Sequence, residues 1–354
     1  MFEHLETLPP DPILGLLGAY QADTSPNKVD LGIGVYKDEQ GATPILKAVR
    51  VAEKRRAQTE PSKTYTGPVG YPGYNQQMLN LVFGNDHQVL TDNRVRSVQT
   101  PGGCGGLRLA ADLIKRARPD ATVWVSSPTW GNHHQLINSA GLKMNEYPYF
   151  DQSTSSLLFD EMMDCLAKIG KGDLVLLHGC CHNPTGADLN REQWQQIADL
   201  AVKNGFTPFI DTAYQGFGEG IEADAWGLRN MAAKVPEMIL VASCSKNFGL
   251  YRERTGLLAI TAATPAEADA THTQIFNIAR GMYTIPPAHG GAIVEIILGD
   301  TELRNLWETE LAGMRNRING LRSDFVEGLI AKGVERDFSF IQRQRGMFSF
   351  LGIS

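Results

Sequence analysis

The sequence predicts an α/β fold with a largely parallel sheet, because short apolar runs alternate with helical patterns along the middle of the chain. Near-continuous apolarity over a few residues is typical of strands covered on both faces. Helical patterns separate most of the runs, as expected for parallel strands joined by helices. The runs are rich in Val, Ile and Leu and span 121–127, 173–179, 206–211, 238–243 and 255–261.

The last two runs lie closer together than the others, so one of them is expected to be an antiparallel neighbour. The clearest helix follows the second run, over residues 190–205. Asn190 and Gln193 have the spacing of a capping box, and Gly205 is a natural stop. Its apolar face would carry Trp194, Ile197, Leu200 and Ala201.

The flanks of the chain differ from this alternating middle. Residues 1–44 are punctuated by Pro and Gly, whereas residues 299–333 predict one long, charged, amphipathic helix. Residues 338–354 are then expected to form a hairpin with "RQRG" as its turn.

Composition excludes several classes of protein. The net charge of −6 over 354 residues argues against a nucleic-acid surface. No apolar stretch reaches the ~18 residues of a membrane span, and the N-terminus lacks the basic region of a signal peptide. The five cysteines are an odd number without CxxC spacing, so we expect reduced thiols, a cytoplasmic protein and no structural metal.

A glycine-rich segment, "QTPGGCGG", runs into a helical pattern at residues 99–106. Glycines let backbone N–H groups approach a phosphate, and a helix N-terminus favours negative charge. The segment matches neither a Walker A loop nor the dinucleotide fingerprint. A phosphate site and a plain turn before a helix are therefore both open for this segment.

The segment "HGCCHNPTG" follows the second apolar run, at residues 178–186. His178, His182 and two cysteines suggest a metal, but adjacent cysteines reach one ion poorly, so a metal is the weaker interpretation. We favour Asn183 as a polar donor, since ligands of open α/β sheets gather at the carboxyl ends of the strands.

Asp211 ends the third apolar run, and Tyr214 follows three residues later. The carboxylate fits a helix cap, which the segment alone slightly favours. It also fits a buried partner for a cationic nitrogen, because a buried carboxylate needs one.

Lys246 stands where the fourth apolar run ends, among Ser243, Ser245 and, further on, Arg254. For most lysines the explanation would be an amine that extends to solvent. Hydroxyls and a guanidinium, however, suit a phosphate, and a desolvated lysine beside a cation has a lowered pKa and can attack a carbonyl. An amine, a phosphate site and an aspartate for a pyridinium together describe pyridoxal 5′-phosphate.

With these segments in order, the chain resembles the class I (fold type I) aminotransferases in "CCHNPTG", "DTAYQGF" and "SCSKNFGLYRER". The segments "LGIGVYKDEQG", "PTWGNH", "PPAHG" and "GMFSF" narrow the resemblance to the aspartate/aromatic branch, closest to its bacterial aspartate aminotransferases. The resemblance implies a mostly parallel seven-stranded sheet in a large domain, residues 45–310. A smaller α+β domain would comprise residues 1–44 and 311–354.

The resemblance also assigns roles to residues. Lys246 would bind the cofactor as a Schiff base and later move the substrate proton. Asp211, supported by His133, would pair with the pyridine nitrogen. Asn183 and Tyr214 would bond the phenolic oxygen, and Trp130 would lie over the ring. The phosphate would be held by Gly103, Cys104, Ser243, Ser245, Arg254 and, from a second subunit, Tyr65.

The implied activity is transfer of the amino group from L-aspartate to 2-oxoglutarate, in two half-reactions through pyridoxamine phosphate. Gly34, Trp130 and Asn183 would bind the α-carboxylate of the substrate. Arg280 of a partner subunit would bind the distal carboxylate, since a guanidinium grips a carboxylate with two hydrogen bonds. The implied assembly is a homodimer with shared active sites, and the alternative activity is that of an aromatic-amino-acid aminotransferase.

Two departures from the family pattern bear on activity. Cys104 stands where relatives usually have Ser or Thr, and a thiol is a weak donor, so cofactor affinity is expected to be lower. The family continues for several tens of residues past "MFSFLGIS", with an arginine for the substrate α-carboxylate. If residue 354 ends the molecule, the alternative to an active aminotransferase is a truncated remnant that binds the cofactor without catalysis.

Overall fold

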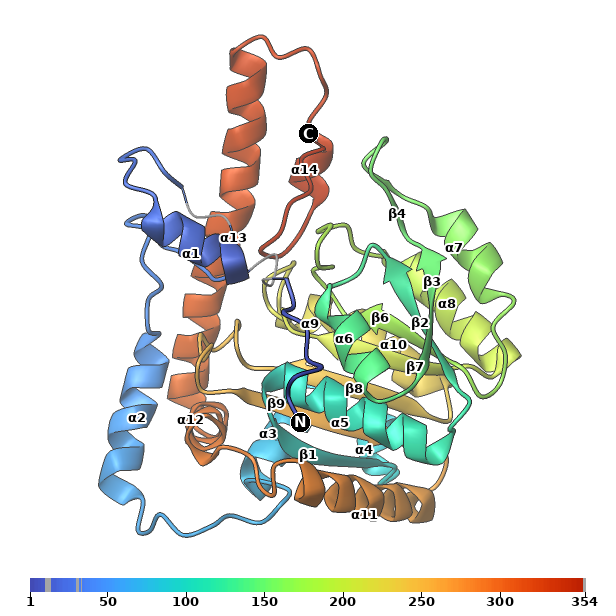
Figure 1. The fold of residues 1–354 in the computed structure, drawn as a ribbon. Helices are drawn as coiled ribbons and strands as arrows, with labels where there is room; N and C mark the ends of the chain where they lie inside the picture. Colours follow the sequence, from blue (N-terminus) through green and yellow to red (C-terminus); the bar gives the residue numbers. More distant parts are fainter. Residues whose placement is uncertain (10–13, 30–31, 33, 353–354) are drawn as a thin grey trace. The chain divides into compact units, whose positions relative to one another are not determined.

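The computed structural model describes residues 1–9, 14–29, 32 and 34–352 (Figure 1). The chain divides into two compact units, residues 1–43 and residues 44–354. In the described part of the first unit there is one helix, α1 (Leu14–Ala22), which the sequence did not predict. Among the helices that the structure describes, none combines the length and apolarity needed to cross a membrane.

A seven-stranded sheet forms the centre of the second unit, in the order β1-β9-β8-β7-β6-β2-β3. Strand β9 is antiparallel to both of its neighbours, and the remaining pairs are parallel, so the mostly parallel sheet is confirmed. The strands are β1 (Val95–Pro101), β2 (Thr122–Ser127), β3 (Lys143–Pro148), β6 (Leu174–His178), β7 (Thr207–Thr212), β8 (Met238–Ser243) and β9 (Thr255–Thr261).

The five predicted apolar runs correspond to β2, β6, β7, β8 and β9. The two remaining strands of this sheet, β1 and β3, were missed. A separate two-stranded sheet pairs β4 (Phe150–Asp151) with β5 (Ser156–Leu157).

The main hydrophobic core lies on the face of the sheet that α5 (Gly102–Ala117), α6 (Asn132–Ser139) and α11 (Pro265–Met282) cover (Figure 1). Gly106 lets α5 approach the sheet, because a Cβ there would lie 2.9 Å from Cγ1 of Val241 in β8. This close approach brings the N-terminus of α5 to the carboxyl end of β8, where the predicted site lies.

The predicted capping box at the start of α8 (Arg191–Asn204) is confirmed. Asn190 Oδ1 accepts from Gln193 N, Gln193 Oε1 accepts from Asn190 N, and Gly205 ends the helix at a φ of 79°. Helix α8 packs against α10 (Trp226–Lys234).

The predicted long helix is α13 (Thr301–Ala331), which packs with α2 (Lys47–Thr59) and α12 (Ala288–Gly299). Glu310 of α13 also caps α2, because its two carboxylate oxygens accept from Lys47 N at 2.8 Å and Ala48 N at 3.1 Å. Helix α13 runs continuously through the expected domain boundary at residue 310, and the division into two domains there stays a prediction. The other helices are α3 (Pro72–Phe83), α4 (Gln88–Thr91), α7 (Phe159–Leu166) and α9 (Ile221–Asp224).

The hairpin expected over residues 338–354 is wrong. The short helix α14 (Phe340–Arg343) forms there, and residues 344–352 are an irregular segment without strand pairing. Buried Arg322 of α13 holds this segment, donating to the carbonyl oxygens of Gly346 and Phe348 and to Ser349 Oγ. Contacts with α13, and not strand pairing, therefore fix this segment.

Candidate active site

Lys246 lies in the loop that joins β8 to β9, and buried contacts fix that loop. Cys244 N donates to Thr255 O at 3.0 Å, across the start and end of the loop. Beyond Lys246, the carbonyl oxygen of Asn247 accepts from Trp307 Nε1 at 2.7 Å, and Trp307 stacks on Phe248 with ring centroids 4.4 Å apart. The long helix α13 thus holds the segment that carries the lysine.

The predicted phosphate residues form one cup beside this loop. Ser243 Oγ donates to Ser245 Oγ at 3.1 Å, and Arg254 Nη1 donates to Ser245 Oγ at 3.3 Å. Two glycines at the start of α5 face the same residues. A Cβ atom added to Gly102 would lie 2.5 Å from Arg254 Nη2, and one added to Gly103 would lie 3.1 Å from Ser243 Cβ.

Cys104 sits in the first turn of α5, next to this cup. Its sulfur accepts a hydrogen bond from Asn132 Nδ2 at 3.2 Å, a partner that sequence reasoning missed. Burial raises the pKa of the Cys104 thiol, while the nearby Arg254 lowers it. The net shift is upward, so the group at this position is a neutral thiol at neutral pH.

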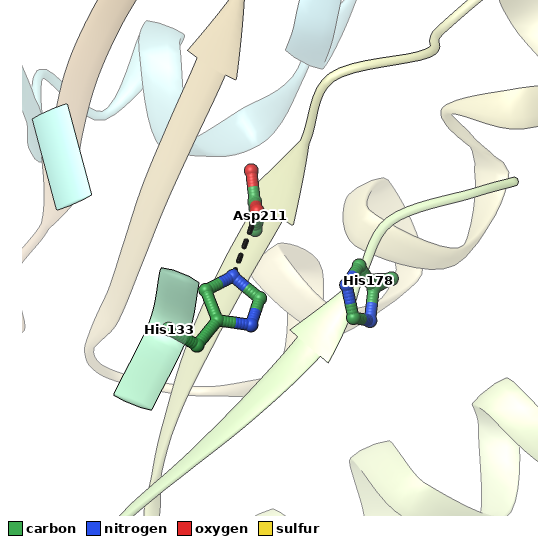
Figure 2. Close-up of side chains that lie close together, drawn as sticks. All are labelled: His133, His178 and Asp211. Atoms are coloured by element: carbon green, nitrogen blue, oxygen red, sulfur yellow. Dashed lines mark hydrogen bonds and ion pairs between the residues drawn. The ribbon is translucent and has the colours of Figure 1, made fainter. Parts of the chain in front are cut away.

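Asp211 is buried at the carboxyl end of β7, and His133 from α6 supports it (Figure 2). His133 Nε2 lies 3.0 Å from Asp211 Oδ2, and Thr129 Oγ1 lies 2.8 Å from His133 Nδ1. Burial raises the pKa of Asp211. The hydrogen bond with His133 and nearby charges, including that of Lys246, lower it by more than burial raises it, so the net pKa is below its usual value. Asp211 caps no helix, since the next helix begins at Ile221, and that alternative is wrong.

Tyr214 links the lysine to the Asn183 loop. Lys246 Nζ lies 5.0 Å from the Tyr214 ring centroid, and the Tyr214 hydroxyl is hydrogen-bonded to the Asn183 side chain. Burial lowers the pKa of Lys246, and Arg254 lowers it further, against the opposing charge of Asp211. The site therefore favours a neutral amine more than water does.

A column of rings continues behind Asp211, and sequence reasoning did not predict it. His178 lies 5.3 Å from His133 and 4.2 Å from His182, measured between ring centroids, and His182 stacks on Tyr149 at 4.1 Å. Both nitrogens of His178 are buried without a hydrogen-bond partner among the described residues. Burial lowers the pKa of His178 to about 3, so the ring stays neutral.

Cys180 and Cys181, for which a metal was the weaker interpretation, lie next to a carboxylate that has other hydrogen-bond partners. Cys180 and Cys181 come within 4.8 Å of an Asp224 oxygen. Both Asp224 oxygens already accept backbone N–H groups, from Gly216, Gly218, Glu219 and Gly220. This carboxylate shapes the loop after Tyr214.

The remaining predicted residues lie in different places. Trp130 packs edge-on against His133, with ring centroids 5.3 Å apart. Tyr65 is 88% exposed, and Arg280 is exposed near the end of α11. Gly34 belongs to the unit of residues 1–43. The binding and catalytic roles given to these residues, and to the others in the site, stay predictions.

The donor set fits a phosphorylated pyridine aldehyde. Serine hydroxyls, a guanidinium, glycine backbone and a helix N-terminus are groups that suit a phosphate. The ionised Asp211 suits a cationic ring nitrogen, and Lys246 is an amine with a lowered pKa.

Comparison with known proteins decides the family. The family model described as "Aminotransferase class I and II" matches residues 26–354. The chain belongs to the class I and II aminotransferases. Aspartate aminotransferases of Haemophilus influenzae and Escherichia coli are each 48% identical to it over 354 residues, which is all of this chain and 89% of each relative. An aromatic-amino-acid aminotransferase of Pseudomonas aeruginosa is 45% identical, over 100% of this chain and 88% of the relative.

Solved structures agree with this aminotransferase in fold. An aromatic-amino-acid aminotransferase from Burkholderia pseudomallei, covalently bound to pyridoxal phosphate, superposes with a TM-score of 0.98 at 44% identity. The match covers 100% of this chain and 89% of that one. The expected fold type I architecture, transaminase class and pyridoxal phosphate cofactor are confirmed.

Proposed function

We propose that this aminotransferase transfers the amino group of L-aspartate to 2-oxoglutarate. The observation that carries the proposal is the position of Lys246, whose amine lies beside the Tyr214 ring and within the electrostatic reach of Asp211 and Arg254. The choice of aspartate rests on relatives at 48% identity that are named aspartate aminotransferases.

Bound pyridoxal phosphate supplies an aldehyde that condenses with amines and a ring that withdraws electrons from the substrate α-carbon. Ser243, Ser245, Arg254 and the start of α5 bind its phosphate. Asp211, held by His133, would hold the ring nitrogen, and its negative charge would keep that nitrogen protonated. Lys246 would hold the aldehyde through its amine, and once the substrate amine takes its place, the neutral Lys246 amine would be the base for the proton on the substrate α-carbon.

The remaining residues orient the reactants. Tyr214 and Asn183, which are hydrogen-bonded to each other, offer donors to the phenolic oxygen of the cofactor. Trp130, held edge-on by His133, would cover the ring and shield it from water. Trp130 and Asn183 bind the α-carboxylate of the substrate.

We also propose a homodimer in which each subunit completes the other's site. Tyr65 and Arg280 support this, because both are exposed although the resemblance gives them binding roles. In the dimer, Arg280 binds the distal carboxylate of aspartate, and Tyr65 reaches the phosphate. The five free cysteines, three of them buried, fit a cytoplasmic enzyme.

Steady-state kinetics tests the proposed substrate. With 2-oxoglutarate as acceptor, kcat/KM for aspartate should exceed that for phenylalanine by about tenfold or more, since the carboxylate gains a bidentate contact worth ~1.5–3 kcal/mol. Arg280→Gln should remove this preference, whereas Arg252→Gln should leave it unchanged. A higher kcat/KM for phenylalanine in the unmodified enzyme would select the aromatic alternative.

Mixing an inactive variant with one impaired towards aspartate tests the shared site. Lys246→Ala and Arg280→Gln subunits, refolded together, form hybrid dimers in which one of the two sites has both residues. Aspartate turnover should return to about a quarter of the unmodified value, from random pairing. If hybrid dimers form but aspartate turnover does not rise above that of the Arg280→Gln variant, Arg280 does not act across the interface.

A further inference from the structure

A large cavity, here called the distal cavity, lies at the ends of the strands opposite to the end that carries Lys246. Its volume is about 950 Å³, and it is lined by the first residues of β6, β7 and β8 and the last residues of β9. The ends of α5 and α8, part of α11 and the loops next to these elements also line it. Asp211 and Ser243 lie at the other end of these strands. The distal cavity is therefore separate from the candidate active site, and its volume falls within the roughly 300–1,000 Å³ typical of small-molecule sites.

The wall of the distal cavity is mainly apolar. Leu113, Ile239 and Ile260 line it and also belong to the main hydrophobic core. Val202 of α8 lines it too, and is 52% exposed. An apolar wall of this kind gains free energy when a hydrocarbon chain displaces water from it.

The rim of the distal cavity is cationic. Arg118 and Lys171 are exposed there, and neither forms an ion pair or side-chain hydrogen bond with any residue that the structure describes. A third cation, Arg116, donates to side-chain oxygens of α11, at Gln274 and Asn277. Glu237 is the one acidic residue among the lining side chains. The rim therefore has an excess of positive charge and two cations available for an anion.

We propose that the distal cavity is a second ligand site, which takes an unbranched monocarboxylate of medium chain length. The hydrocarbon tail lies along the wall of Leu113, Ile239 and Ile260, and the carboxylate binds Arg118 and Lys171. An apolar tail with a single anionic end matches the wall and the rim, whereas a short dicarboxylate would leave the wall exposed to water.

Titration calorimetry of the pyridoxal phosphate-loaded enzyme with decanoate, below its micelle concentration, tests the proposal. We expect one saturable site per chain. The double variant Arg118→Glu/Lys171→Glu should weaken binding by at least about tenfold, the loss expected when an ion pair becomes a repulsion. Val202→Trp, which fills the cavity from an exposed position, should weaken it similarly. Lys203→Glu, on the same helix but outside the lining, is the matched control and should bind decanoate normally.

Decanol, with the same tail and no charge, should bind more weakly than decanoate and should be insensitive to the charge-reversing variant. Aspartate turnover should be unchanged in all the variants, which also shows that they fold. Absence of saturable decanoate binding would overturn the proposal. Binding that competes with aspartate and that neither variant weakens would place decanoate in the active site and would overturn it equally.

Discussion

His133 Nε2 lies 3.0 Å from Asp211 Oδ2, and both side chains are almost completely buried. The two residues come from different elements, α6 and β7, which are far apart in the sequence. The contact holds the carboxylate in one orientation, and it lowers a pKa that burial alone would raise. A carboxylate prepared in this way remains ionised when a cationic ring nitrogen lies against it.

Replacing His133 should therefore impair catalysis without preventing cofactor binding. His133→Phe keeps an aromatic ring but removes the hydrogen bond, so kcat should fall by about 10- to 100-fold, as for other residues that orient a functional group. The neighbouring His134→Phe, at a half-buried position of α6 that does not contact Asp211, is the control and should retain kcat. Equal losses in both variants would show that helix packing is responsible and not the hydrogen bond.

Arg254 should dominate binding of the cofactor phosphate. Arg254→Ala removes a charged donor next to Ser245, so the dissociation constant of pyridoxal phosphate should rise by about 10- to 100-fold, equivalent to ~1.5–3 kcal/mol. Titration of the apoenzyme with cofactor measures it. Arg252→Ala, two residues earlier and also exposed, should bind normally. Unchanged affinity in Arg254→Ala would remove this residue from the phosphate cup.

Cys104→Ser should strengthen cofactor binding. A hydroxyl donates a better hydrogen bond than a thiol, and Asn132 can still donate to the oxygen, so the dissociation constant should fall by about three- to tenfold. The same apoenzyme titration measures the change, with Cys165→Ser, in α7, as the control. Weaker binding in Cys104→Ser would mean that the thiol does not face the phosphate.

Acid should destabilise the fold partly through His178. Its pKa is lowered from 6.5 to about 3, so the unfolded chain binds a proton in this range that the folded chain does not. The stability associated with the neutral ring is thus complete above pH 6.5 and is lost as the pH falls towards 3. Between pH 7 and pH 5 the loss should be roughly 1–2 kcal/mol.

Urea unfolding at the two pH values measures this loss. His178→Phe should lose correspondingly less stability on acidification than the unmodified protein. His4→Gln, at an exposed position, should behave as the unmodified protein does. An unchanged pH dependence in His178→Phe would show that the ring is protonated without cost in the folded state.

Most of the sheet could be predicted from apolar runs, but its two edges could not. Strands β1 and β3 stand at the edges of the seven-stranded sheet, and each carries polar side chains such as Arg96 and Glu146. An edge strand is covered less completely than a central one, so its sequence lacks the continuous apolarity that revealed the others.

In the candidate site too, residues that are close in the sequence could be predicted, whereas contacts between separate elements could not. Lys246, Ser243, Ser245 and Arg254 are near one another in the sequence, and their chemistry could be inferred directly. The ring column of His178, His182 and Tyr149 depends on how β6 lies beside β7 and β2, which no local pattern specifies. The partner bond from Asn132 to Cys104 likewise joins two helices.

Chemical mapping of the amine that binds the cofactor tests the central claim most directly. The enzyme loaded with pyridoxal phosphate is reduced with borohydride, which fixes the cofactor to its amine, then digested and analysed by mass spectrometry. We predict a single labelled residue, Lys246, with loss of the visible absorbance in Lys246→Ala and its retention in Lys234→Ala. Label on another lysine, or unchanged absorbance in Lys246→Ala, would contradict the assignment of this site.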